Sequence, residues 1–112
     1  MMKRGEIWFA DLSPTVGSEI NKRWPVIIVS NNANNRAAST VTVLPITSNV
    51  DKIYPFEVAL SIEASGLSKA SKALAQQIRT IARQRIVGRC IGQLDHQTMD
   101  SINHAIRLRL AL

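Results

Sequence analysis

The hydrophobic and polar positions along the chain predict several short β-strands. Residues 3–12 are rich in β-forming side chains and place Ile7 and Phe9 on one face and Trp8 on the other. Val26–Val29 is an uninterrupted apolar run, which is typical of a central strand that is buried on both faces. The other runs expected to form strands are 40–46, 54–60, 73–81 and 85–90.

Turn-forming residues separate these runs. The polar stretch 15–23 is expected to form a long loop. Four asparagines within 30–39 predict a loop or a short helical turn, because their side chains compete for backbone hydrogen bonds. Gly66 and its neighbouring serines predict a hairpin or loop over 61–71.

The C-terminal segment has the pattern of an amphipathic helix. Asp95 is suited to cap its N-terminus, and apolar side chains recur every three or four residues. This apolar stripe consists of Met99, Ile102, Ile106 and Leu110. Short strands followed by a terminal helix predict a mainly β fold, namely a small barrel or curled sheet closed by a helix.

Length and composition narrow the class of protein. The 112 residues fit one domain, 1–112, and no run approaches the roughly 20 apolar residues of a membrane span. The N-terminus lacks the apolar stretch of a signal peptide, and the single cysteine, Cys90, cannot form an internal disulfide. A reducing cytoplasm is therefore expected.

The charge balance indicates an anionic partner. Fourteen Lys and Arg face eight Asp and Glu, which gives a net charge of +6. Such an excess favours nucleic acid or an acidic protein as the partner, although a soluble protein can also be basic without one.

The sequence lacks most familiar catalytic arrangements. On one helix, His96 and His104 would lie about 12 Å apart, too far to act as an acid–base pair on one phosphate. The carboxylates are scattered, a lone cysteine cannot build a zinc site, and there is no glycine-rich phosphate loop. The sequence therefore predicts no metal and no cofactor.

Cations and hydroxyl groups remain as candidates for chemistry. Arg23 stands where the 15–23 loop meets a strand, and Thr47 and Ser48 follow another strand. Side chains at strand ends are rigidly placed yet exposed, and a guanidinium together with a hydroxyl suits a phosphate group. On spacing alone, Thr47 and Ser48 also fit an ordinary turn.

Six blocks in register carry a family resemblance. They are 4–19 (RGEIWFADLSPTVGSE), 25–30 (PVIIVS), 44–49 (LPITSN), 54–58 (YPFEV), 77–81 (QIRTI) and the closing LRLAL. Together they resemble the MazF/PemK family of toxin endoribonucleases, the toxin half of toxin–antitoxin pairs, over nearly the whole chain.

This resemblance implies a small SH3-like β-barrel of the CcdB/PemK/MazF plasmid-toxin type, with a C-terminal helix, acting as a homodimer. It implies a metal-independent endoribonuclease that cleaves single-stranded RNA, usually mRNA, at a short sequence and leaves a 2′,3′-cyclic phosphate and a 5′-hydroxyl. It also implies a cognate MazE-like antitoxin whose acidic segment covers the RNA groove.

The catalytic pair of the family maps onto this chain only in part. The family threonine corresponds to Thr47, but Trp24 occupies the position of the family arginine, directly before the proline that opens the strand. Arg23 stands one residue earlier, and a shift of one residue along a strand turns a side chain to the other face. Arg23 and Thr47 are the expected catalytic residues, with Lys22 as the alternative cation. Gln76 also departs from the family, because many relatives have an acid there.

The remaining basic, polar and aromatic side chains of these blocks are expected to hold the RNA strand through phosphate contacts and base stacking. The residues expected to bind RNA are Lys22, Trp24, Ser48, Asn49, Lys52, Tyr54, Gln77, Arg79, Arg83 and Arg85. Two other functions stay open: a toxin of the same fold that inhibits a topoisomerase by protein contact, and an RNA-binding barrel that does not cleave.

Overall fold

The computed structural model of the chain describes residues 2–12 and 23–112. The strands are β1 (Glu6–Asp11), β2 (Arg23–Ile28), β3 (Thr40–Thr47), β4 (Glu57–Leu60), β5 (Ser71–Leu74), β6 (Arg79–Ala82) and β7 (Ile86–Gln93). The helices are α1 (Asn32–Ala37), α2 (Ile62–Ser65) and α3 (His96–Leu110), with 3-10 turns η1 (Ala75–Gln77) and η2 (Arg83–Arg85). None of the helices in this part of the chain is long and apolar enough to span a membrane.

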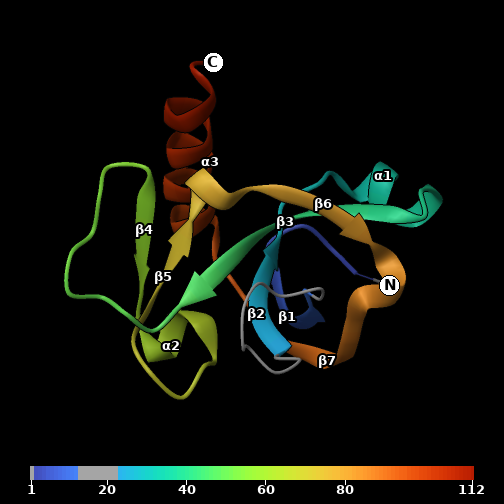
Figure 1. Cartoon of the computed structure of the whole chain (residues 1–112), viewed down its shortest axis with the longest axis horizontal. Coiled ribbons are helices and arrows are strands. Elements are labelled where there is room, and N and C mark those ends of the chain that lie inside the picture. The colour runs from blue at the N-terminus through green and yellow to red at the C-terminus, as the bar shows by residue number, and fades with distance from the viewer. Residues whose placement is uncertain (1, 13–22) are drawn as a thin grey trace.

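The strands form one bent antiparallel sheet in the order β4-β5-β3-β2-β1-β7. The long strand β3 has two partners, because its first half pairs with β6 and its last residues, Ile46 and Thr47, pair with β5 (Figure 1). The predicted mainly β fold with a C-terminal helix is confirmed. The sheet stays open rather than closing into a barrel, since β4 and β7 lie at its two ends.

Strands β2 and β3 are buried on both faces, which confirms the central strand predicted at Val26–Val29. On one face, Ile27 and Leu44 contribute to a core that also contains Met99 and Ile102 of α3. On the other face, Val26 lies in a second core. The other buried members of that second core are Met2, Ala10, Ile28, Val41, Val43 and Ile81. The continuous apolar run is therefore explained by two cores on opposite sides of one strand pair.

Helix α3 begins as predicted, because the Asp95 side chain accepts a hydrogen bond from the Thr98 backbone N–H at 2.8 Å. Met99 and Ile102 are buried and Ile106 packs against the first core. Leu110, the last member of the predicted stripe, is 47% exposed, because the helix extends beyond the sheet (Figure 1).

The region 73–81 corrects the sequence analysis, which predicted one strand. The backbone N–H of Ala75 donates to the Phe56 carbonyl, and the 3-10 turn η1 then separates β5 from β6. The two strands consequently pair with different parts of β3. The expected loop over 61–71 also contains a short helix, α2, which begins after Ser61 and ends at Gly66 in the left-handed conformation.

The remaining boundaries differ less. The asparagine-rich segment forms the short helix α1, one of the two expected outcomes, and the strand expected over 54–60 begins only at Glu57. Strand β7 is longer than the expected 85–90. It is irregular against β1, because Ile7 pairs with Gly92 while Phe9 pairs with Val87. The surplus residues of β7 form a bulge.

Candidate functional site

A cavity of about 450 Å³ lies where β2 begins and β3 ends. Trp24 of β2, Thr47 of β3 and Arg79 of β6 all line it. The other lining residues are Leu12, Pro45, Ile46, Asn49, Glu57, Lys72, Leu74, Gln76 and Gln77. Five residues expected to form the site, namely Trp24, Thr47, Asn49, Gln77 and Arg79, therefore meet around one cavity.

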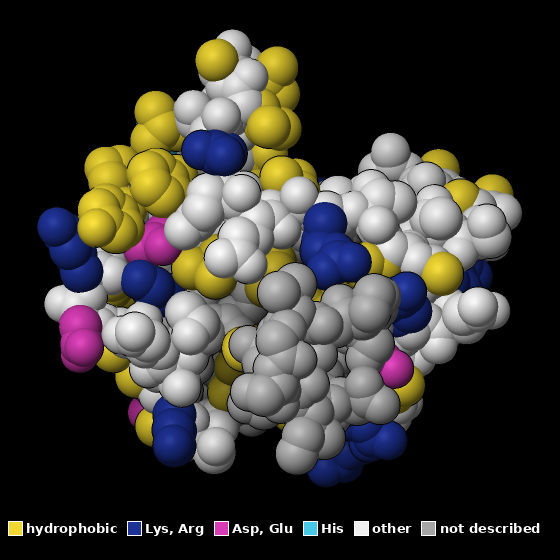
Figure 2. All heavy atoms as spheres, viewed as in Figure 1, with side chains coloured by type: hydrophobic (Ala, Val, Ile, Leu, Met, Phe, Trp, Pro, Cys, Tyr) yellow, Lys and Arg dark blue, Asp and Glu magenta, His cyan; other side chains and the backbone are white. Residues whose placement is uncertain are grey.

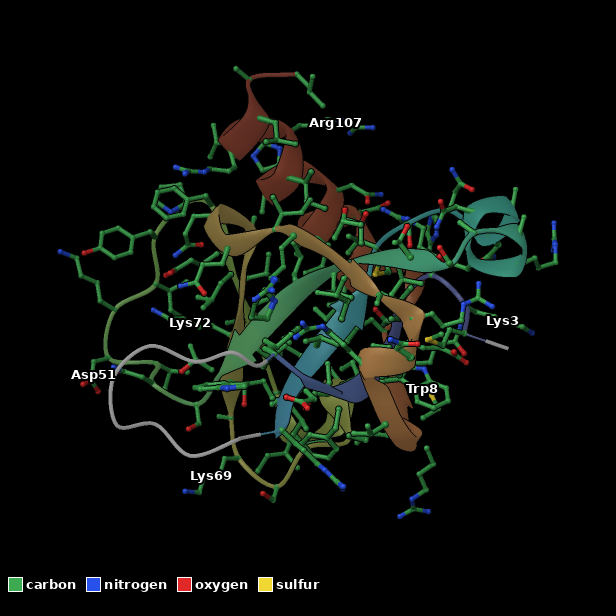
Figure 3. All side chains as sticks on the ribbon, turned by 45° about the vertical axis from the view of Figure 1, so that its right-hand side comes forward. Lys3, Trp8, Asp51, Lys69, Lys72 and Arg107 are labelled. Carbon is green, nitrogen blue, oxygen red and sulfur yellow. The ribbon has the colours of Figure 1, made fainter. Side chains whose placement is uncertain are left out.

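A second cavity of about 540 Å³ adjoins the first. The two share Trp24, Ile46, Thr47 and Asn49 in their linings. Ser48 and Lys69 line only the second cavity. Figure 3 labels Lys72, which belongs to the first cavity, and Lys69, which belongs to the second, on the same side of the molecule. Thr47 and Trp24 thus stand where the two hollows meet.

The strand register explains why Trp24 and Thr47 meet. Val26 lies opposite Pro45 in the antiparallel β2–β3 pair, so two further residues along each strand bring Trp24 to the level of Thr47. Residues that face each other across an antiparallel pair project from the same side of the sheet. The sequence folds this way because the second core fixes Val26 on that side.

Arg23 has a different position. It is the first residue of β2, its Cα pairs with that of Asp11, and its side chain is exposed. It lines neither cavity that Thr47 lines. Because successive residues of a strand point to opposite faces, the backbone directs Arg23 away from the face of Trp24. The structure therefore brings Thr47 together with Trp24 and Arg79 and does not bring it together with Arg23.

The Thr47 hydroxyl is held at the end of β3. Its Oγ1 accepts a hydrogen bond from the Asn49 backbone N–H at 3.2 Å, which fixes the turn that follows the strand. Thr47 is half-buried. Since a hydroxyl can donate one hydrogen bond and accept two, Thr47 keeps a donor for a ligand oxygen while it holds the turn.

A buried ion pair forms part of the first cavity's wall. Lys72 Nζ lies 3.0 Å from Glu57 Oε1 and 2.6 Å from the Lys52 carbonyl oxygen. The Gln76 amide donates to Glu57 Oε2 at 2.6 Å, and the Tyr54 backbone N–H donates to Oε1 at 2.9 Å. This network ties the segment before β4 to strand β5.

The same contacts set the ionisation of Glu57. Burial raises the pKa of this carboxyl, but the hydrogen bonds from Tyr54, Gln76 and Lys72, together with the charge of Lys72, lower it by more. The pKa of Glu57 therefore lies below its ordinary value, and the side chain is a carboxylate at neutral pH. Because Lys72 balances this charge, the pair is an electrically neutral part of the wall.

The other described residues that are expected to bind RNA lie outside the two cavities. Lys52 Nζ is 5.0 Å from the ring centre of Tyr54, which stacks on Phe56 with the ring centres 5.5 Å apart. Arg83 donates to the Asn35 carbonyl, and Arg85 donates to the Asp11 carbonyl at 3.4 Å. Lys22 lies outside the described residues.

Sequence reasoning did not identify Glu57, Lys72 and Lys69 as part of this region. Glu57 and Lys72 are 15 residues apart and meet only because β4 pairs with β5. No local motif marks either residue, although a lysine and a glutamate in neighbouring buried strands would be a signal for an ion pair. Within 2–12 and 23–112, no three His, Cys, Asp or Glu side chains are grouped so that they could hold a metal ion.

Figure 2 shows one face of the molecule, on which Lys and Arg side chains are more widely distributed than Asp and Glu side chains. The net charge of +6 agrees with this view. A surface of this kind attracts polyanions over a distance comparable with the Debye length, about 8 Å at physiological salt.

Comparison with known proteins gives concordant results. Residues 3–110 match the family described as PemK-like, MazF-like toxin of type II toxin–antitoxin system. The chain is 44% identical to endoribonuclease MazF9 of Mycobacterium tuberculosis, covering 100% of this chain and 98% of the relative. It is 39% identical to endoribonuclease EndoA of Bacillus subtilis, covering 100% and 97%. It also resembles the solved structure of a mycobacterial endoribonuclease in complex with its cognate antitoxin, with a TM-score of 0.83, 28% identity, and coverage of 100% and 97%.

Proposed function

Because the chain belongs to the PemK-like, MazF-like toxin family, we propose that this endoribonuclease cleaves single-stranded RNA by using the RNA's own 2′-hydroxyl as the nucleophile. The observation that carries this proposal is the cavity in which Thr47, Trp24 and Arg79 meet. It offers a hydroxyl, an aromatic surface and a guanidinium to one nucleotide and its phosphate.

The proposed reaction is an internal transfer. The 2′-oxygen forms a bond to phosphorus while the bond from phosphorus to the 5′-oxygen breaks. One proton leaves the 2′-hydroxyl and one reaches the departing 5′-oxygen, so the products are a 2′,3′-cyclic phosphate and a 5′-hydroxyl. Neither a metal nor a cofactor enters this balance. DNA, which lacks the 2′-hydroxyl, should stay intact.

Thr47 has the proposed role of positioning the reacting groups. Its free donor can bind a non-bridging phosphate oxygen or the 2′-hydroxyl, while its bond to the Asn49 backbone N–H keeps the side chain in place. Holding the 2′-oxygen in line with the bond that breaks can contribute several kcal/mol, within the roughly 7–11 kcal/mol available from positioning.

Arg23 is the other proposed catalytic residue. Its side chain is exposed at the start of β2 and lines neither cavity, so in this proposal it has to approach the phosphate around the end of the strand. A guanidinium stays protonated in proteins, which makes it a donor to phosphate oxygens and to the leaving oxygen rather than a base.

Binding of the RNA strand is proposed to use stacking and phosphate contacts. Trp24 presents its ring inside the cavity, and Tyr54 is 42% exposed beside Lys52. The other residues proposed to bind RNA are Lys22, Ser48, Asn49, Gln77, Arg79, Arg83 and Arg85. Of these, Arg83 and Arg85 have carbonyl partners, so they must exchange a protein contact for a phosphate.

Two protein partners complete the proposal. An acidic, flexible MazE-like antitoxin segment would compete with RNA for the basic face, and a second copy of the chain would form a homodimer. Leu108, Leu110 and Leu112 are exposed at the end of α3, where a partner molecule can cover them. Figure 2 shows hydrophobic side chains gathered at this projecting end.

The proposed reaction is tested with the purified protein, a mixed-sequence RNA, DNA of the same sequence, and a chelator. We expect the RNA to be cut with the chelator present, the new ends to be a cyclic phosphate and a 5′-hydroxyl, and the DNA to remain intact. A 2′-deoxy substitution at the cleaved nucleotide should abolish the cut.

Variants assign the roles. Thr47→Ala should lower the cleavage rate at least tenfold. Thr40→Ala is the control, because Thr40 is an exposed threonine at the other end of β3 and lines neither cavity. RNA that is bound but never cut would instead support an RNA-binding barrel without catalysis. The observation that favours this alternative is that Arg23 points away from the face of Trp24 and Thr47. Equal rates for Thr47→Ala and the unmodified protein would remove Thr47 from the site.

A further inference from the structure

We propose that Arg79 is a further catalytic residue, whose guanidinium stabilises the charge that develops on the cleaved phosphate. This inference rests on the proposed function and adds to it the group that acts from the wall of the cavity. Three observations support it: Arg79 lies close to Thr47 in the cavity lining, its side chain is free to bind a ligand, and Trp24 stands where the family has an arginine.

Position is the first argument. Arg79 opens β6 and pairs with Val43 of β3, the same strand that carries Thr47 at its end. Arg79, Thr47 and Trp24 line one cavity, whereas Arg23 lines neither cavity next to Thr47. A phosphate that accepts a hydrogen bond from the Thr47 hydroxyl in this cavity therefore lies on the side of Arg79.

Availability is the second argument. Lys72 shares the cavity but is held by Glu57 and by the Lys52 carbonyl, and its side chain is only 10% exposed. The side chain of Arg79 is exposed, and no hydrogen-bond or ion-pair partner occupies its guanidinium within the described part of the chain. Since Lys72 balances Glu57, Arg79 supplies the excess positive charge of the cavity lining.

The chemistry matches this arrangement. As the 2′-oxygen bonds to phosphorus, negative charge grows on the two non-bridging oxygens before the bond to the 5′-oxygen breaks. The planar guanidinium can donate to both oxygens at once and keeps its proton throughout, so it adds no step to the proton balance. Trp24 carries no charge, so the guanidinium of Arg79 on β6 is the group in this lining that can bind both oxygens.

The second cavity extends the inference to the path of the RNA. Lys69 lines that cavity together with Thr47 and Trp24, and Arg79 lines only the first. A strand that crosses Thr47 thus meets Arg79 on one side and Lys69 on the other. Lys69 has the role of holding a neighbouring phosphate, which affects binding and not the chemical step.

The test measures kcat and KM for cleavage of one short RNA of defined sequence by five variants of the full chain, one of which is Thr47→Ala. Arg79→Ala should lower kcat about 10²–10³-fold. Arg79→Lys should restore only part of this rate, because a lysine lacks the planar guanidinium that binds two oxygens at once. Lys69→Ala should raise KM with kcat unchanged. For Lys69→Ala, a plot of the logarithm of the RNA-binding constant against the logarithm of the salt concentration should have a slope smaller in magnitude by about 0.7, which is the value for one phosphate contact on a single strand.

Arg89→Ala is the matched control, because Arg89 is also an exposed strand arginine and lines neither cavity. Circular dichroism confirms that each variant is folded. A kcat for Arg79→Ala within twofold of the unmodified protein, while Thr47→Ala shows its expected loss of at least tenfold, would overturn this inference and leave the proposed function standing. If the unmodified protein does not cut RNA at all, the proposed function fails first.

Discussion

The two faces of the β2–β3 strand pair are built from the same strands but are covered differently. On one side, Ile27 and Leu44 are covered by α3, and the core consists of apolar side chains. On the other side, the second core gives way at the ends of the strands to a cavity whose wall contains a buried Glu57–Lys72 pair.

This difference separates stability from chemistry. The helix-covered side gains its stability from the burial of apolar surface, which depends little on the identity of nearby polar groups. The cavity side must keep charged and hydroxyl groups in fixed positions, and it does so with hydrogen bonds whose loss leaves buried groups unpaired. Mutations on the two sides should therefore have different signatures.

The largest expected effect on stability is on the cavity side. Lys72→Met removes the cation from a Glu57 side chain that is only 3% exposed, and breaking a buried pair in this way costs about 3–5 kcal/mol. We expect the free energy of unfolding, measured in urea, to fall by this amount. The double variant Lys72→Met/Glu57→Met is the control and should be more stable than the single variant, because it leaves no buried charge.

A second variant tests the helix-covered side. Ile102 of α3 is fully buried in the first core, and Ile102→Ala should lower the free energy of unfolding by about 2–5 kcal/mol. The rate of RNA cleavage per folded molecule should stay the same, since Ile102 lines neither cavity next to Thr47. A matching loss of kcat would show that the two sides are not separable.

A smaller effect is expected from Tyr54, which lies outside both cavities. Tyr54→Ala should weaken the binding of single-stranded RNA by about 1–3 kcal/mol if a base stacks on this ring. Fluorescence anisotropy with a labelled RNA measures the change, and Tyr54→Phe, which keeps the flat ring, should bind like the unmodified protein. Equal affinity for Tyr54→Ala would exclude this ring from the RNA path.

The smallest effect is a pH dependence of stability. Because the folded-state pKa of Glu57 lies below its unfolded value of about 4.3, its ionised form stabilises the fold at pH values above 4.3. This contribution disappears as the pH falls through the lowered pKa. The stability difference between the unmodified protein and Glu57→Gln should therefore stay constant from about pH 7 down to about pH 5 and shrink as the pH falls below about 4.3, as urea midpoints can show. A difference that does not shrink at all would mean that the pair is not ionised.

The fold could be predicted well where the pattern is local. The apolar run at Val26–Val29 and the cap at Asp95 each depend on a few neighbouring residues, and both appear in the structure as expected. The break at η1 could not be predicted, because it depends on the bond from Ala75 to the Phe56 carbonyl, which joins two strands.

The candidate site likewise has a part that local sequence predicts and a part that it does not. Thr47 and Arg79 belong to recognisable blocks, whereas their common cavity depends on how β2, β3 and β6 pair. The ion pair of Glu57 and Lys72 depends on the β4–β5 register. A sequence states which side chains exist near a site, and the pairing of strands decides which of them face one another.

The bulge in β7 has a consequence for the behaviour of the protein in concentrated solution. Strand β7 ends the sheet, and an unpaired strand edge is a template on which a strand from another molecule can add. Gly88, with φ of 76°, kinks β7 at the bulge, and α2 approaches Gly92 so closely that a Cβ atom there would clash with the Ser65 carbonyl. Edge-to-edge growth into aggregates is thereby discouraged by backbone shape, without any charged residue having to be placed inside the sheet.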